Sequence, residues 1–237
     1  MASAEILIFG AALAGTAAAA CYWFAIRPWF LNWGATEAEI EAPMPGDEVI
    51  RDPVRVSTRS VTINAQPEDV WPWLAQMGYQ RGGLYTYDWI DRRLGALDEP
   101  SAERISPQFQ HLEAGDVIPI GNGPDWPVKD LEWNRFLLAH IQAPGMEYTW
   151  SWVLNELDES HTRLVLRTRT QLTGTLLTLL FHLVDPGSFL MTRKHLLGIK
   201  RRAQVAAWQS EDWLAGGLRR ASLLPPVSLS RQRRTTL

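Results

Sequence analysis

The stretch TRSVTINAQPEDVWPWLAQMG, residues 58–78, combines a strand pattern with the start of a helix. Residues 55–63 alternate in character and are rich in Val and Thr, which predicts a first strand. Pro67 suits the first position of a helix, and two carboxylates follow it in the first turn, where the helix dipole favours them. We therefore expect the domain to begin with a strand that leads directly into a short helix.

Downstream of this unit, the pattern predicts a second helix over about residues 85–94 and then several strands. Turn-forming residues separate four strand-like stretches, which are 116–120, about 133–141, 147–156 and 161–171. This spacing suits an antiparallel meander. The apolar run 172–184 is too short to span a bilayer. Asp185 and Pro186 have the signature of a helix start, which predicts a long helix to about Leu214, ended by Gly216 and Gly217.

Four segments carry a resemblance to a known family: residues 58–78, RGGLYTYDW at 81–89, residues 101–121 and FLMTRKHLLGIKRRA at 189–203. They resemble the START-like helix-grip superfamily, also called SRPBCC, in particular its polyketide cyclase/dehydrase-like branch. The resemblance implies an α+β fold in which a curved antiparallel sheet is wrapped around a long C-terminal helix. It also implies a cavity for a lipid, polyketide or other hydrophobic molecule. A minority of members are enzymes, and no catalytic residue is common to all of them.

We divide the chain into four parts on composition. Residues 1–33 are predicted to form a membrane anchor helix with an aromatic belt, and residues 34–53 an acidic, proline-bearing linker or wrapped arm. Residues 54–215 are expected to form the helix-grip domain. Residues 216–237 are basic and are expected to be a disordered tail.

The N-terminal segment predicts membrane attachment. Residues 6–26 carry no charge, and a helix of that length spans about 31 Å, close to the hydrocarbon thickness of a bilayer. Arg27 follows the run while Glu5 precedes it, which favours a single-pass protein with a cytoplasmic globular domain. A cleaved signal peptide is an alternative, but the segment lacks a positive n-region. An alanine-rich helix that packs on another element is a second alternative.

Composition excludes several classes of function. A net charge of −3 and a pI of about 6.0 argue against a nucleic-acid partner. Cys21 is the only cysteine, so no internal disulfide or cysteine-rich zinc site is possible. The histidines lack metal-ligand spacing, and no nucleotide-binding or nucleophile-elbow motif is present. We therefore expect no metal site and no cofactor.

One strand has the pattern of a cavity wall. Tyr148, Trp150, Trp152 and Leu154 share one face by the two-residue period of a strand. Such a face can line a pocket or can simply fill a core. The residues expected to contact a ligand are Tyr85, Tyr87, Trp89, Trp150, Trp152, Met191 and His195.

The candidates for chemistry are weaker. Asp88, Tyr87 and His195 are possible general acids or bases if they lie at the cavity. Asp88 and Arg92 are four residues apart, which equally predicts an ordinary surface ion pair on a helix. The last helix is also strongly basic, which suits either a solvated face or a membrane-facing one.

Three functions are open at this point. The first is a membrane-anchored binding protein for a lipid or other hydrophobic small molecule, with the membrane contacted through residues 6–26 and possibly the basic tail. The second is an enzyme like the polyketide cyclases and dehydrases. The third is a non-catalytic interaction module with a filled core, which a cavity smaller than about 300 Å³ would favour.

Overall fold

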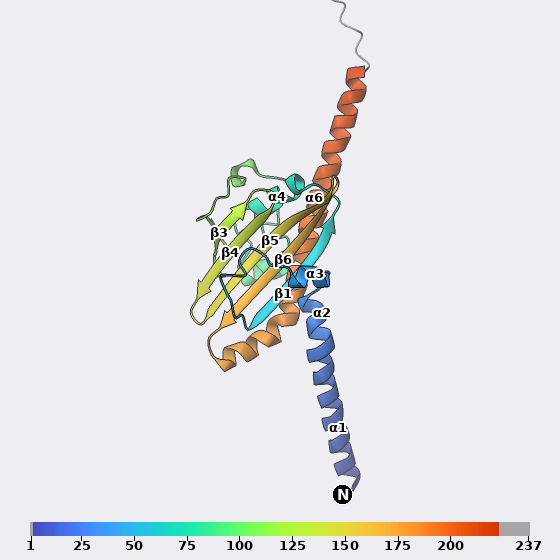
Figure 1. The fold of residues 1–237 in the computed structure, drawn as a ribbon, viewed down its shortest axis with the longest axis vertical. Coiled ribbons are helices and arrows are strands. Elements are labelled where there is room, and N and C mark those ends of the chain that lie inside the picture. Colours follow the sequence, from blue (N-terminus) through green and yellow to red (C-terminus); the bar gives the residue numbers. More distant parts are fainter. Residues whose placement is uncertain (1, 223–237) are drawn as a thin grey trace, which may run out of the picture.

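A six-stranded antiparallel sheet and one long helix dominate the computed structural model, which describes residues 2–222, without the side chains of residues 2–8, 11, 176, 179, 183 and 210–222. The strand order is β1-β6-β5-β4-β3-β2, and α6 crosses one face of the sheet (Figure 1). The strands are β1 Arg55–Ile63, β2 Val117–Ile118, β3 Trp126–Glu132, β4 Phe136–Ala143, β5 Met146–Asp158 and β6 His161–Leu172. The predicted α+β class and its antiparallel sheet are confirmed.

Strand β1 spans the residues predicted for it and pairs with β6 along its whole length, from Arg55 opposite Thr170 to Ile63 opposite Thr162. Strand β3 was not predicted, and β4 begins three residues later than expected. Trp126 and Val128 alternate with Pro127 and Lys129 for only four residues, and the alternation ends at Asp130. A β-bulge between Val128 and Asp130 also shifts the register in which β3 pairs with β4.

Two short helices lie between β1 and β2 in the chain. Helix α4, Pro67–Ala75, buries Trp71, Trp73 and Leu74 despite the proline at position 72. Helix α5, Asp88–Leu94, is shorter than the predicted 85–94 and ends at Gly95, whose φ of 72° suits a glycine. The large core cluster joins α4, the inner face of the sheet and α6.

Helix α6 runs from Thr175 to Ser222, so it begins earlier and ends later than predicted. The predicted start at Asp185 is wrong: Pro186 lies inside the helix, where the ribbon bends (Figure 1). A proline removes one backbone hydrogen bond and so bends a helix without necessarily ending it. Asp185 does not act as an N-cap because its carboxylate is ion-paired with arginines of other elements. The predicted end at Gly216 is also wrong, and the rest of the expected tail, 223–237, lies outside the described residues.

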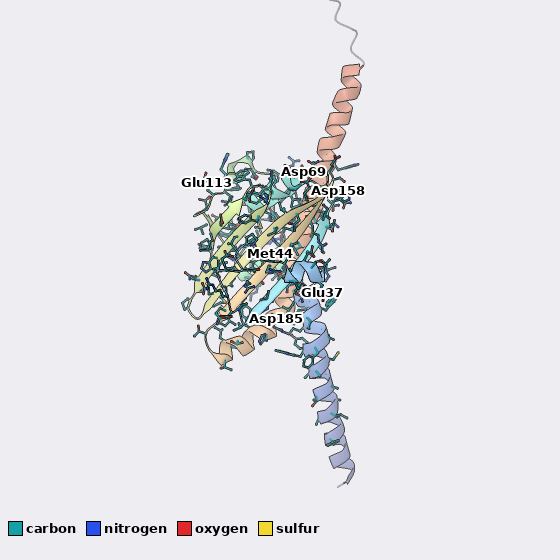
Figure 2. The ribbon with its side chains drawn as sticks, viewed as in Figure 1. Glu37, Met44, Asp69, Glu113, Asp158 and Asp185 are labelled. Carbon is teal, nitrogen blue, oxygen red and sulfur yellow. The ribbon has the colours of Figure 1, made fainter. Side chains whose placement is uncertain are left out.

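The acidic segment after residue 33 packs on the outer face of the sheet. Helix α3, Glu37–Glu41, begins with a capping box at Thr36. Glu39 pairs with Arg163 at 2.6 Å, and Asp47 pairs with Arg167 at 2.7 Å. Figure 2 shows Met44 in front of the sheet, on the side opposite α6. Charge complementarity between this segment and the outward arginines of β6 therefore covers a polar sheet face.

The N-terminal helices form one rod that projects from the body (Figure 1). It consists of α1 Ala2–Cys21, a π-helical turn at Tyr22–Ile26 and α2 Arg27–Leu31. Phe30 and Leu31 are buried against Phe189 of α6. Among the residues that the structure describes, no helix has the length and apolar character needed to cross a bilayer, so the transmembrane prediction for 6–26 is not supported. Alanine, which is frequent in this run, favours insertion only weakly.

Candidate ligand-binding site

The inner face of the sheet brings a buried arginine next to hydroxyl and aromatic side chains. Alternate residues of a strand point to one face, and the strand registers align two adjacent rows across β1, β6 and β5. These rows are Arg55–Thr170–Tyr148 and Ser57–Thr168–Trp150. The floor beneath the bend of α6 is therefore charged at β1, polar at β6 and aromatic at β5.

A hollow of about 190 Å³ lies over these rows. Its sheet side is formed by Arg55, Met146, Tyr148, Trp150, Thr168 and Thr170. Its helix side is formed by Phe181 and Ser188, which lie on either side of the bend at Pro186. Because most ligand pockets measure about 300–1,000 Å³, this hollow suits only a compact molecule.

Arg55 is held at the edge of the hollow by Asp185. Arg55 Nε lies 2.5 Å from Asp185 Oδ1, and the two side chains are 4% and 0% exposed. Burial lowers the pKa of Arg55, while the Asp185 charge opposes that shift. Phe181 covers the guanidinium, with its ring centroid 5.7 Å from Arg55 Cζ. Arg55 Nη2 has no hydrogen-bond partner among the described residues.

Two further arginines, Arg27 and Arg59, lie near the Asp185 carboxylate. Arg27 Nε donates to Asp185 Oδ2 at 3.0 Å. Arg59 Nε donates to the carbonyl of Phe30 at 2.8 Å, and Arg59 Nη2 has no partner in the described part of the chain. Burial and, to a smaller extent, the nearby Arg55 charge lower the pKa of Arg59 to about 9, while the Asp185 charge opposes the shift. Figure 2 places Asp185 at the end of the sheet where α2 meets α6.

The aromatic side of the hollow is the edge of a tryptophan stack. The ring of Trp150 lies 4.8 Å from that of Trp126 and 5.4 Å from that of Trp152, between centroids. Burial raises the pKa of Tyr148, although a hydrogen bond with Trp126 opposes the shift. Sequence reasoning missed Trp126 because it lies on the unpredicted strand β3.

Trp152 and His195 are packed together in the core rather than along an open cavity. His195 Nδ1 lies 2.7 Å from the carbonyl oxygen of Leu84, so this nitrogen carries the hydrogen and donates it. Trp152 Nε1 donates to His195 Nε2 at 3.0 Å. Burial lowers the pKa of His195 to about 4. With both ring nitrogens engaged and the ring neutral, this geometry does not favour a role for His195 as a general acid or base.

The predicted polar-aromatic cluster forms a second hollow of about 430 Å³, on the α5 side of α6. It is an open surface hollow, lined by Tyr85, Tyr87, Asp88, Trp89 and Arg92 together with cationic residues of α6. Tyr85 is 1% exposed and donates to the carbonyl of Trp73 at 3.0 Å, whereas Trp89 is 70% exposed. Glu103 pairs with Arg201 and Arg202 at its rim, which neutralises part of the basic helix face.

Asp88 has a structural role in this second hollow. Its carboxylate accepts from the backbone N–H of Ser101 at 3.1 Å and from the Ser101 hydroxyl at 2.7 Å. Arg92 Nε donates to the backbone carbonyl of Asp88 at 3.3 Å instead of to its carboxylate, so the predicted ion pair gives way to a backbone contact. No cluster of His, Cys, Asp or Glu among the described residues is arranged to hold a metal ion.

The residues predicted from sequence to contact a ligand therefore lie in different places in the structure. Trp150 lines the inner hollow, while Tyr85, Tyr87 and Trp89 line the outer one. Trp152 and His195 lie buried in the core, and Met191 is half-buried without lining either hollow. Sequence reasoning missed Arg55, although a charged residue at an inward position of an alternating strand is a usable signal.

No family model and no curated protein matches the sequence. Similar solved structures include the Zhui aromatase/cyclase from Streptomyces sp. R1128, with 17% identity over 64% of this chain and 97% of that one, at a TM-score of 0.39. An HSP90 activator from Plasmodium falciparum is 14% identical over 60% of this chain and 96% of its own, at a TM-score of 0.36. A protein from Thermobifida fusca is 13% identical over 62% and 92%, at 0.40.

All three TM-scores lie below 0.5, so these similarities carry no argument about activity. The functional argument therefore depends on the geometry of the two hollows.

Proposed function

We propose that this protein binds a compact hydrophobic molecule in the hollow between the sheet and the bend of α6. The observation that carries the proposal is the composition of that hollow, in which Trp150, Tyr148, Met146 and Phe181 surround a few polar groups. Mostly apolar walls with a small number of fixed polar groups are typical of small-molecule sites. The helix-grip arrangement, with the ligand between sheet and helix, is part of this proposal.

Burial of apolar surface supplies the affinity in this arrangement. Each square ångström of apolar area removed from water contributes roughly 25 cal/mol. The half-buried ring of Trp150 offers aromatic surface for contact with a planar ligand. The hydroxyls of Thr168, Thr170 and Ser188 supply directional contacts that orient the polar end of the ligand.

The geometry favours binding without chemistry. A cyclase-like or dehydrase-like reaction needs a free acid or base beside the ligand. Asp88 is held by Ser101, and both ring nitrogens of His195 are occupied. Tyr87 lines the outer hollow, away from the tryptophan stack. An enzymatic function therefore has less support from these contacts than a carrier or sensor function.

A lipid as the ligand stays a prediction from the sequence, and a volume of about 190 Å³ favours a short or compact one. Membrane attachment through residues 6–26, with or without the basic tail, and a cytoplasmic location also stay predictions.

The test is calorimetric titration of the full-length protein with two-ring probes, the neutral 2-naphthol and the acid 2-naphthoate. Ser188→Trp places an indole in the hollow and is expected to abolish binding of both probes. Leu180→Trp is the control, because it introduces the same indole on the other side of the bend at a side chain that is 50% exposed. Circular dichroism checks that both variants are folded. Failure of both probes to bind the unmodified protein would overturn the proposal.

Two observations favour a second candidate, the interaction module with a filled core. The hollow of about 190 Å³ is smaller than the roughly 300 Å³ at which typical small-molecule sites begin. Trp152 is 0% exposed and Leu196 and Ile199 of α6 pack with it in one cluster, so the centre of the sheet–helix interface is filled. The two candidates make opposite predictions for the titration above. A protein that binds neither probe yet stays folded fits the second.

A further inference from the structure

We propose that the molecule held in this hollow carries an acidic group, and that Arg55 receives it. This inference rests on the proposed function and names its ligand class, a compact hydrophobic carboxylic acid. Three independent observations on the described residues support it: a charge imbalance, an unpartnered donor and a shared wall.

The charge imbalance lies at the joint between α2, β1 and α6. Three guanidinium groups, those of Arg27, Arg55 and Arg59, meet there. In the part of the chain that the structure describes, Asp185 is the carboxylate ion-paired with Arg27 and Arg55, and Arg59 forms no ion pair of its own. His182, whose Nδ1 lies 3.0 Å from Arg27 Nη2, supplies no negative charge. A buried cation without a counter-charge is strongly unfavourable, so the cluster favours an additional anion.

The unpartnered donor shows where that anion binds. Arg55 Nε and Asp185 Oδ1 form an ion pair at 2.5 Å that lacks hydrogen-bond geometry, and Arg55 Nη2 also has no hydrogen-bond partner among the described residues. The Arg55 side chain is 4% exposed, so bulk water does not compensate for the missing hydrogen bond. A guanidinium donates along two edges, and a carboxylate fits such an edge in a bidentate manner. Arg55 Nη2 is thus a buried donor that an acidic group can satisfy.

The shared wall connects this donor to the hollow. Arg55 lines the hollow itself, and Thr170 is its register partner on β6. Thr168, one row further on, is tied to Ser57 by a hydrogen bond of 2.9 Å between hydroxyls. A carboxylate beside Arg55 and Thr170 leaves the attached hydrocarbon directed toward Trp150. The acidic group of the ligand therefore lies near β1 and its hydrophobic ring lies near β5.

Other polar groups satisfy these observations less well. A ketone, alcohol or amide accepts one hydrogen bond from Arg55 but leaves the excess positive charge in place. An amine adds to that excess and is repelled by it. We therefore expect discrimination between an acid and its neutral isostere of the same shape.

The experiment compares 2-naphthoate with 2-naphthamide by calorimetric titration of the full-length protein at pH 7. A charge-assisted hydrogen-bonded pair predicts a roughly ten- to hundredfold preference for the acid. Arg55→Met is expected to lower the affinity for naphthoate by a much larger factor than the affinity for naphthamide, so that the preference for the acid disappears. Arg135→Met is the matched control, since Arg135 is an arginine paired with Glu132 on the surface and 70% exposed.

The outcomes separate this inference from the proposed function. Equal affinity for the two probes, or naphthoate binding that survives Arg55→Met, overturns the acid ligand and leaves the hydrophobic site standing. Absence of binding by both probes and by 2-naphthol overturns both. If Arg55→Met does not fold, the preference of the unmodified protein for naphthoate and its reduction in Thr170→Val decide the question.

Discussion

Arg55 Nε lies 2.5 Å from Asp185 Oδ1, so the first residue of β1 is joined to the bend of α6 by a fully buried ion pair. Arg27 Nε reaches the other oxygen of the same carboxylate at 3.0 Å and adds α2 to the joint. A single side chain therefore fixes the N-terminal rod, the edge of the sheet and the long helix relative to one another. The candidate ligand site lies directly beside this joint.

Replacing Asp185 by Asn should strongly destabilise the protein. The change leaves Arg27 and Arg55 without their shared counter-charge, and breaking a buried pair on one side costs about 3–5 kcal/mol. Urea unfolding followed by circular dichroism measures the loss. Glu132→Gln, which breaks the exposed pair with Arg135, is the control and should change the free energy of unfolding by less than about 1 kcal/mol. Equal effects of the two substitutions would contradict a structural role for the buried pair.

The protein should become less stable as the pH is lowered, because His195 takes up a proton on unfolding. Its pKa is lowered by burial from 6.5 to about 4, so between these values the unfolded chain binds a proton that the folded chain does not. Linkage then makes the free energy of unfolding decrease as the pH falls from about 6.5 to 4. We expect this residue to account for roughly 2–3 kcal/mol between pH 7 and 4.5.

The measurement compares urea unfolding at pH 7 and pH 4.5 for the unmodified protein, His195→Gln and His140→Gln. His195→Gln should lose less stability on acidification, whereas His140→Gln, whose ring pairs with the partly exposed Glu147, should behave like the unmodified protein. An identical loss in all three proteins would mean that His195 binds its proton as readily in the folded protein as in the unfolded chain, which would contradict the lowered pKa.

The arm over residues 34–53 should detach from the sheet when Arg167 is replaced by Met. The Arg167 guanidinium donates to the carbonyls of Ala42, Glu39 and Ile40 at 2.7–2.8 Å and pairs with Asp47. Its loss removes the arginine donor from three part-buried carbonyl groups, at up to about 1–3 kcal/mol each.

A glutamate-specific protease reports on this detachment, because the arm contains Glu37, Glu39, Glu41 and Glu48. Cleavage within the arm should be faster in Arg167→Met than in the unmodified protein and in the Arg135→Met control. Unchanged cleavage would mean that other contacts hold the arm on the sheet.

The contrast between β1 and α6 shows what could be predicted from the sequence. The alternation of Arg55–Ile63 is a local signal, and the observed strand has those limits. The Asp185–Pro186 pair is also a local signal, for a helix start, but here tertiary ion pairs with Arg27 and Arg55 override it. Strand β3 has only a short local signal, because its alternation ends at Asp130 and a proline inside a strand argues against one.

The candidate site was only partly predictable for the same reason. Trp150 belongs to a visible alternating pattern and does line the inner hollow. Arg55 depends on partners in β6 and α6, whose register with β1 is set by long-range pairing. Asp88 and His195 are chemically suitable residues, but their partners Ser101 and Leu84 are distant in sequence and engage them structurally.

Two glycines of α6 should respond in opposite ways to alanine. A Cβ at Gly198 would lie 2.3 Å from the carbonyl oxygen of Tyr85, whose own φ of 58° leaves that backbone little room to move. Gly198→Ala should therefore separate α6 from the loop before α5 and destabilise the protein by about 1–3 kcal/mol. At Gly187 the position that a Cβ would occupy is open, with no neighbouring atom within 4 Å, so alanine there should stabilise the helix by up to about 1 kcal/mol. Thermal unfolding of the two variants measures both shifts, and a loss of stability in Gly187→Ala equal to that in Gly198→Ala would contradict the close approach of α6 to Tyr85.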